Sequence, residues 1–221
     1  MELSGLKINF LGDSITYGAG VSGPDKIFHA ILKRETGIAE VRNYGIGSTR
    51  YAVQKGTDYR PKDTWADRLS FCERFGEMDD DADMIVVFGG TNDYGHGDAP
   101  LGCMSDRTPD TFYGACHYLY SGLITKYPGK PIVIMTPTHR INETSNIAER
   151  PVAFGTLKQY VDIIREVAEF YSLPVFDLFK ISGLQPEVPV IRETYMPDGL
   201  HPNDKGHEII ADKLKKFLQA L

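Results

Sequence analysis

The sequence predicts an α/β fold in which a mostly parallel sheet of five strands is covered by helices on both faces. Short apolar runs alternate with amphipathic segments along the 221 residues. Two of the runs, Met84–Phe88 and Ile132–Met135, contain no polar residue, which is typical of parallel strands buried on both faces. The alternation of strands and helices implies right-handed crossovers, and the length fits one domain over residues 1–221.

The strands are predicted from the apolar runs, which are Ile8–Leu11, Val41–Tyr44, Met84–Phe88, Ile132–Met135 and Pro174–Phe179. Ligands of such sheets bind beyond the carboxyl ends of the strands, so the residues that follow each strand are the first candidates for a functional site. Three connections are long for plain turns and are also expected to carry function: Thr91–Arg107, His139–Gly155 and Ser182–Pro197.

Five helices are predicted around these strands. The first lies near Lys26–Glu35 and ends at Gly37, and the second covers roughly Thr64–Phe75. The third begins at Thr108, which is followed by proline and is therefore a suitable N-cap. The last two helices are predicted from apolar side chains at spacings of three and four residues. The fourth has Leu157, Tyr160, Val161, Ile164, Val167, Ala168 and Tyr171 on one face. The fifth begins after an N-cap at Asn203 and has Ile210, Leu214, Phe217, Leu218 and Leu221 on one face.

Composition excludes several classes of function. The net charge is −6 and no cluster of Lys or Arg is present, which argues against a nucleic-acid partner. No apolar run approaches the ~18 residues of a membrane span, so stable membrane insertion is not expected. The three cysteines, an odd number without a CxxC pair, and the lack of a visible signal peptide favour reduced thiols and a cytoplasmic location. The acidic run Glu77–Asp83 is interpreted as a solvated loop rather than a calcium site.

Four polar or glycine-rich turns lie where this fold builds its site. Gly12–Thr16 follows the first strand, Gly45–Thr49 the second, Gly89–Asp93 the third, and Asp198–Pro202 precedes the last helix. Because parallel strands end at the same edge of the sheet, these turns are expected to converge.

The residue types in these turns match the needs of nucleophilic catalysis. The hydroxyl of Ser14 is a weak nucleophile that requires an adjacent base, and His201 can supply it. Asp198, three residues earlier, is close enough to bind the imidazole and fix its tautomer. Three donors are expected to bind a developing oxyanion, namely the backbone N–H groups of Ser14 and Gly47 and the side-chain amide of Asn92.

The four turns together resemble the sequence blocks of the SGNH hydrolases, also called GDSL-type esterases and lipases. The segments GDSIT, YGIGST, GGTND and DGLHP appear in the family's order and span nearly the whole chain, with GDSI where many members read GDSL. The family's Ser, Gly, Asn and His correspond to Ser14, Gly47, Asn92 and His201, and its acid to Asp198. The resemblance implies a flavodoxin-like three-layer α/β/α sandwich and hydrolysis of esters or thioesters without metal or cofactor.

The substrate is less well defined than the chemistry. We expect a small-molecule ester, first of all a short-chain or acetyl ester of a carbohydrate. The alternatives are a lysophospholipid or an acyl-thioester, transfer of the acyl group to an alcohol, and a non-catalytic ligand-binding protein that retains the fold. The sequence is compatible with both a monomer and a homo-oligomer.

Four further residues near the site are candidates for substrate binding. Asp13 is expected to order the Ser14 loop through backbone hydrogen bonds. Arg50, His139 and Arg140 follow strands and are expected near the site. The two arginines are candidates for holding an anionic group, although an exposed loop position explains them equally well.

The remaining histidines are interpreted as structural. His29, His96 and His117 receive no catalytic role, and His207 is expected on the surface of the last helix. A metal site formed by His207 with Asp198, His201 and Asp204 is disfavoured, because the spacing is not that of an HExxH motif.

Overall fold

The computed structural model describes residues 1–55, 69–145 and 154–221, and within them five parallel strands form one sheet. The strands are β1 (Lys7–Gly12), β2 (Glu40–Gly45), β3 (Met84–Phe88), β4 (Ile132–Met135) and β5 (Val175–Phe176), in the spatial order β2-β1-β3-β4-β5. In the centre of the sheet, Ile8 of β1 is paired with Val41 of β2 on one side and with Met84 of β3 on the other. The expected fold class is confirmed, and all five strands are parallel.

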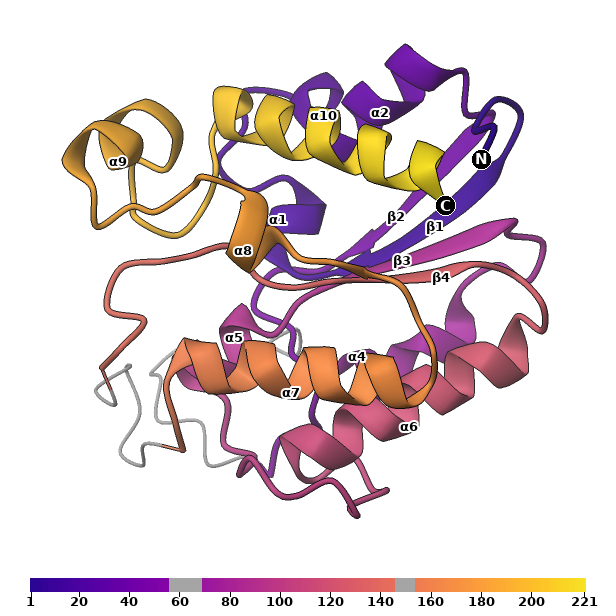
Figure 1. The fold of residues 1–221 in the computed structure, drawn as a ribbon, viewed down its shortest axis with the longest axis vertical. Helices are drawn as coiled ribbons and strands as arrows, with labels where there is room; N and C mark the ends of the chain where they lie inside the picture. The colour runs from indigo at the N-terminus through magenta and orange to yellow at the C-terminus, as the bar shows by residue number, and fades with distance from the viewer. Residues whose placement is uncertain (56–68, 146–153) are drawn as a thin grey trace.

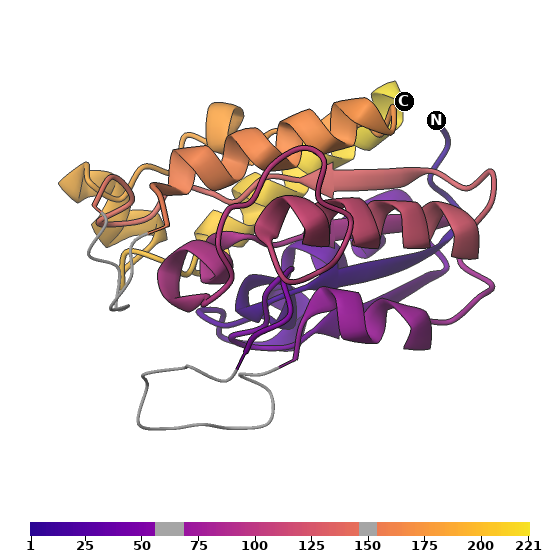
Figure 2. The same cartoon turned by 90° about the horizontal axis from the view of Figure 1, so that it is seen from below.

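Helices cover both faces of the sheet (Figure 1). One face carries α1 (Ser14–Tyr17), α2 (Phe28–Thr36) and α10 (Asp204–Ala220), and the other carries α4 (Phe71–Arg74), α5 (Thr91–His96), α6 (Phe112–Lys126) and α7 (Leu157–Phe170). Figure 2 views the second face, where α6 and α7 run side by side. The shorter elements are η1 (Pro24–Lys26), η2 (Phe75–Glu77), α8 (Leu178–Ile181) and α9 (Pro189–Tyr195). These are the three layers of an α/β/α sandwich.

The two faces of the strands belong to two separate apolar cores. Successive side chains of a strand point to opposite faces. In β3, Ile85 and Val87 therefore pack with α6 and α7, whereas Met84 and Val86 pack with α2 and α10. The two cores hold the sheet rigidly between the helical layers, and the strand ends are fixed with it.

The order of the strands creates a topological switch point between β1 and β3. The chain leaves β1 towards α2 on one face and leaves β3 towards α6 on the other, so the two connections diverge (Figure 1). Ligands of open parallel sheets bind at such a switch point, outside the carboxyl ends of the strands. Ser14 follows β1 and Asn92 follows β3, so the topology brings these two predicted residues to the switch point.

Three element boundaries differ from those predicted. The third helix begins after Thr111 rather than Thr108, because the Thr111 hydroxyl accepts from the N–H of Gly114 while the Thr108 hydroxyl is engaged with Asp110. The last strand is only Val175–Phe176, since Asp177 accepts from the N–H of Lys180 and starts α8. Helix α4 begins at Phe71 behind a Ser70–Glu73 capping box, and the part of the predicted helix before residue 69 lies outside the described residues.

Two of the three long connections contain short helices. The connection Thr91–Arg107 begins with α5, and Ser182–Pro197 contains α9. Of the third, His139–Gly155, the structure describes 139–145 and 154–155. Among the helices of the described residues, none combines the length and the apolar character that crossing a membrane requires.

His207 is buried, and its expected surface position is wrong. Its Nδ1 accepts a hydrogen bond of 3.1 Å from the N–H of Phe28, and its ring stacks on the Phe28 ring with centroids 5.8 Å apart. Burial, and secondarily the charges of His29 and His201, lower the pKa of His207 to about 4. The neutral imidazole therefore joins α10 to the start of α2.

This burial predicts a specific pH dependence of stability. The pKa of His207 in the folded protein lies below its unfolded value near 6.5. The contribution of His207 to the free energy of unfolding is therefore complete above pH 6.5 and is lost as the pH falls towards 4. The variant His207→Gln keeps an acceptor for Phe28 but does not titrate. Urea unfolding at about pH 8 and about pH 5 should show a loss of stability on acidification that is about 2 kcal/mol smaller in the variant. An equal loss in both proteins would contradict the assignment.

Candidate active site

Ser14 lies at a tight turn between β1 and α1. Asp13 is the N-cap of α1, and its carboxylate accepts a hydrogen bond of 3.0 Å from the N–H of Ile15, which is the loop-ordering role expected for it. A Cβ atom at Gly12 would lie 2.0 Å from the Thr16 hydroxyl oxygen, so the turn requires glycine there. Ser14 is the first helical residue, where a backbone N–H has no acceptor within the helix.

A single carboxylate shapes the turn that carries His201. Asp198 Oδ1 accepts from the N–H groups of Leu200, at 2.9 Å, and of His201, at 2.7 Å. Its second oxygen, Oδ2, is 2.6 Å from His201 Nδ1. Gly199, which follows Asp198 in this turn, has φ 77°, a left-handed conformation that suits glycine. The aspartate therefore fixes both the backbone of the turn and the orientation of the imidazole.

The two turns meet through a side-chain hydrogen bond. Ser14 Oγ lies 2.9 Å from His201 Nε2. Because Nδ1 faces the Asp198 carboxylate and carries the proton, Nε2 is the acceptor of the Ser14 hydroxyl. Partial burial raises the pKa of Asp198, but hydrogen bonds from the side chain and backbone of His201 outweigh this and hold that pKa below its usual value. The predicted serine, histidine and aspartate thus form one continuous chain.

Asn92 and the Gly47 turn lie beside each other. Asn92 is in the first turn of α5, is 4% exposed, and donates from Nδ2 to the carbonyl oxygen of Thr49 at 3.1 Å. Gly47 lies in the turn after β2, and no heavy atom is within 4 Å of the position that a Cβ would take there. The backbone at Gly47 therefore faces open space, while the amide of Asn92 is anchored to the same loop.

Two buried charged residues that the sequence did not single out connect the turns. Arg74 of α4 donates to the carbonyl oxygens of Gly12, at 2.6 Å, and Tyr44, at 2.5 Å. Asp93 accepts from the N–H groups of Tyr51 and Ala52 at 3.0 and 3.1 Å. Arg74 thereby joins the ends of β1 and β2, and Asp93 ties the segment after β2 to α5. Asp93 stands inside the GGTND segment, whereas nothing in the pattern around Arg74 marks it.

Burial raises the pKa of two acids that stand next to predicted site residues in the sequence. Desolvation raises the pKa of Asp13 to about 6, against the opposing effect of the Ile15 N–H and the charge of His201. Desolvation also raises the pKa of Asp93 to about 6, against its hydrogen bonds from Tyr51 and Ala52. Both carboxyl groups are therefore mostly ionised above neutral pH and become neutral in mild acid.

The candidate substrate-binding residues occupy different environments. Arg50 is completely buried, so an exposed loop position is wrong and the side chain offers no surface to a substrate. His139 is partly exposed, with Nδ1 2.8 Å from Glu143 and its ring 3.9 Å from that of Phe179. Arg140 is half-buried and donates to the Thr91 carbonyl oxygen at 3.2 Å, at the start of α5. His139 and Arg140 therefore lie at the carboxyl end of β4, as expected.

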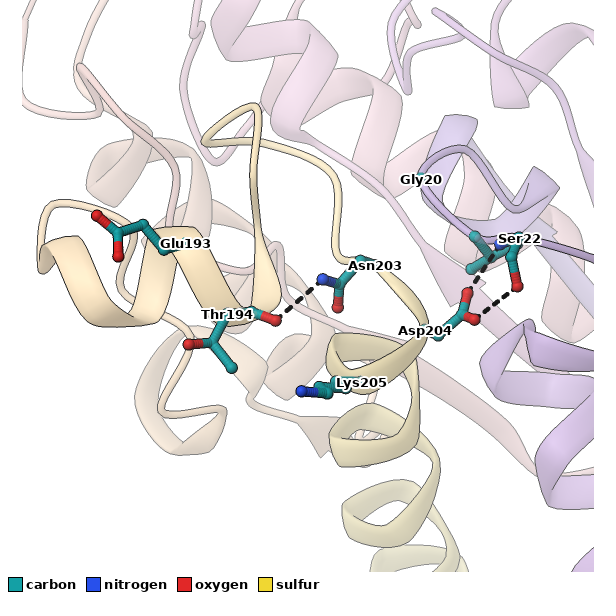
Figure 3. A pocket seen from close by; sticks show the side chains of 8 residues that line it. Gly20, Ser22, Glu193, Thr194, Asn203, Asp204 and Lys205 are labelled. Atoms are coloured by element: carbon teal, nitrogen blue, oxygen red, sulfur yellow. Dashed lines mark hydrogen bonds between the residues drawn. The ribbon is translucent and has the colours of Figure 1, made fainter.

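An open cavity of about 660 Å³ lies beside the start of α10 (Figure 3). It is bordered by Gly20, Val21, Ser22, Glu193, Thr194, Asn203, Asp204 and Lys205. One wall is held by Asp204, whose carboxylate accepts from the N–H and hydroxyl of Ser22 at 2.8 and 2.6 Å. A Cβ at Gly20 would lie 2.6 Å from the Pro202 carbonyl oxygen, so this cavity directly adjoins the His201 turn.

The chain belongs to the GDSL-like lipase/acylhydrolase family, whose sequence profile matches residues 10–209. This confirms the resemblance drawn from the four sequence blocks. It also confirms, at the level of the family, the expected class of hydrolases that act on ester bonds.

Similar proteins include one with a curated activity. An acetylxylan esterase of Xylanibacter ruminicola is 27% identical over 227 residues, which cover 95% of this chain and 43% of that protein, so the chain spans less than half of its length. A crystal structure of a protein from Lactobacillus plantarum is 30% identical, with a TM-score of 0.80 and 98% of each chain covered. A carbohydrate acetylesterase family member from Sinorhizobium meliloti, 18% identical over 97% of this chain and 98% of its own, shares the fold with a TM-score of 0.63.

Proposed function

We propose that this protein is a serine esterase in which Ser14 is the nucleophile, His201 the general base and Asp198 the residue that orients the base. The observation that carries the proposal is the pair of side-chain hydrogen bonds, 2.9 Å from Ser14 Oγ to His201 Nε2 and 2.6 Å from His201 Nδ1 to Asp198 Oδ2. A weak nucleophile next to a base that a carboxylate orients is the arrangement that activates serine.

The reaction is acyl transfer to water through an acyl-enzyme. His201 takes the proton as Ser14 Oγ attacks the ester carbonyl, and the oxyanion is held by the N–H groups of Ser14 and Gly47 and by the amide of Asn92. His201 then protonates the leaving alcohol. Water, activated by the same histidine, releases the acid and restores the serine.

The proposed substrate is a short-chain or acetyl ester of a carbohydrate. Support comes from the acetylxylan esterase relative, whose similarity extends over 95% of this chain. The open cavity next to the His201 turn is bordered by Glu193, Thr194 and Lys205, whose polar groups can bind a hydroxyl-rich alcohol. The proposed compartment is the cytoplasm, since Cys72, Cys103 and Cys116 are free thiols.

Replacement of the nucleophile tests the mechanism. The protein should hydrolyse p-nitrophenyl acetate, and Ser14→Ala should lower kcat by roughly 10⁴-fold or more, because no other hydroxyl is placed next to His201 Nε2 in the described part of the chain. Ser4→Ala, which changes an exposed serine near the N-terminus, should keep full activity. Equal activity of the wild-type protein and Ser14→Ala would show that Ser14 is not the nucleophile.

Removal of one oxyanion donor tests the role of Asn92. Asn92→Ala should lower kcat by ~10²–10³ with little change in KM, because the donor acts on charge that develops only in the transition state. The isosteric variant Asn92→Asp should lose at least as much, since a carboxylate repels the oxyanion. Steady-state kinetics on thermally intact variants give the answer, and an unchanged kcat in Asn92→Ala would refute the assignment.

A series of acyl chains tests the substrate class. kcat/KM should be highest for p-nitrophenyl acetate and fall through butyrate to octanoate. The protein should also release acetate from acetylated xylo-oligosaccharides. An optimum at octanoate or longer would instead favour the lipolytic alternative, without affecting the assignment of the nucleophile.

A further inference from the structure

We propose that His96, held by Arg50, is a positioning residue that fixes and polarises the side-chain amide of Asn92 for oxyanion binding. The inference rests on the proposed oxyanion role of Asn92 and extends it to two buried residues that do not touch the substrate. It gives a function to an arginine and a histidine for which the mechanism above has no use.

The three side chains form a continuous buried chain. Asn92 and His96 are four residues apart in α5, and such a spacing places two side chains on one face of a helix. His96 Nε2 is 3.0 Å from Asn92 Oδ1. On the other side of the ring, Arg50 Nε is 2.9 Å from His96 Nδ1, and a second guanidinium nitrogen contacts the same atom. Arg50 is 0% exposed, Asn92 4% and His96 8%.

The donor and acceptor roles in this chain are determined by Arg50. A guanidinium only donates, so His96 Nδ1 must accept and cannot carry a proton. The neutral ring then bears its proton on Nε2 and donates it to Asn92 Oδ1. The amide is thereby held with its oxygen towards His96.

The same orientation places the Asn92 nitrogen correctly for its proposed task. One N–H of Nδ2 donates to the Thr49 carbonyl oxygen at 3.1 Å, and the second is assigned to the oxyanion. With Oδ1 and Nδ2 both anchored, the amide does not need to reorganise when negative charge develops, which is the property that makes an oxyanion donor effective.

The positive charge at the far end of the chain strengthens the donor. Hydrogen bonds in series polarise one another, more so in a buried environment of low dielectric. Arg50 draws electron density through the imidazole from Asn92 Oδ1, which makes the N–H groups of the amide stronger donors. No proton moves along the chain, and the effect requires only the fixed charge and the neutral ring.

Two substitutions of His96 separate this role from a packing role. His96→Leu removes both ring nitrogens and should lower kcat for p-nitrophenyl acetate about tenfold, with KM within about twofold of the wild-type value. His96→Gln can donate to Asn92 and accept from Arg50, so it should restore most of kcat. The control His117→Leu replaces another buried histidine, in α6, and should not change kcat. Equal losses in His96→Leu and His96→Gln would overturn the proposal.

A double substitution identifies the residue through which His96 acts. In the Asn92→Ala background the target amide is absent, so His96→Leu should have no further effect on kcat. The same fold-loss in both backgrounds would show that His96 acts independently of Asn92 and would refute the proposal.

The ring itself can be observed in the unmodified protein, which keeps the proposal testable if His96→Leu does not fold. Nitrogen-15 NMR of the wild-type protein at neutral pH should show His96 neutral and protonated on Nε2. A proton on Nδ1, or a charged ring, would overturn the proposal. An inactive wild-type protein that still shows this tautomer would refute the esterase function and leave the hydrogen-bond chain intact, so the two failures are distinguishable.

Discussion

The hydrogen bond between Ser14 and His201 joins two turns that are 187 residues apart in the chain, and the arrangement of the C-terminal part of the fold maintains it. Helix α10 begins directly after the His201 turn and packs on α2 across one face of the sheet. Asp204 at its start binds Ser22, and His207 one turn later binds the N–H of Phe28. These contacts fix the position of His201 relative to the loop that carries Ser14.

A second set of buried polar contacts aligns the turns on the β2 and β3 side. Arg74 bonds to the ends of β1 and β2, and Asp93 to the backbone of Tyr51 and Ala52. Burying these charges is costly, as the raised pKa of Asp93 shows, and hydrogen bonds to the backbone partly compensate for it. Such a network favours one geometry of the turns, as the proposed oxyanion donors require.

Much of the fold, and the meeting of Ser14 with His201 and Asp198, could be predicted because the sequence signals for them are local. Unbroken apolar runs identified β3 and β4. Ser14 and Asn92 come shortly after predicted strands, and Asp198 and His201 come shortly before a predicted helix. The buried network was not predicted, because nothing local distinguishes Arg50, Arg74 or His96 from an exposed polar residue. The burial of His207 did leave a signal, since it precedes Ile210 by three residues and so continues the apolar stripe of α10. Thr111, which caps the third helix in place of the predicted Thr108, is the same residue type, and only the observed hydrogen bond from the Gly114 N–H identifies it as the cap.

The most direct test of the central claim is to trap the nucleophile. The purified protein would be treated with a fluorophosphonate ester, which reacts with a serine activated by a neighbouring base, and the modified peptide would be located by mass spectrometry. The account predicts one adduct per chain, on Ser14, and much slower labelling when His201 is replaced by alanine. An adduct on a different residue, or labelling of Ser14 at the same rate without His201, would contradict it.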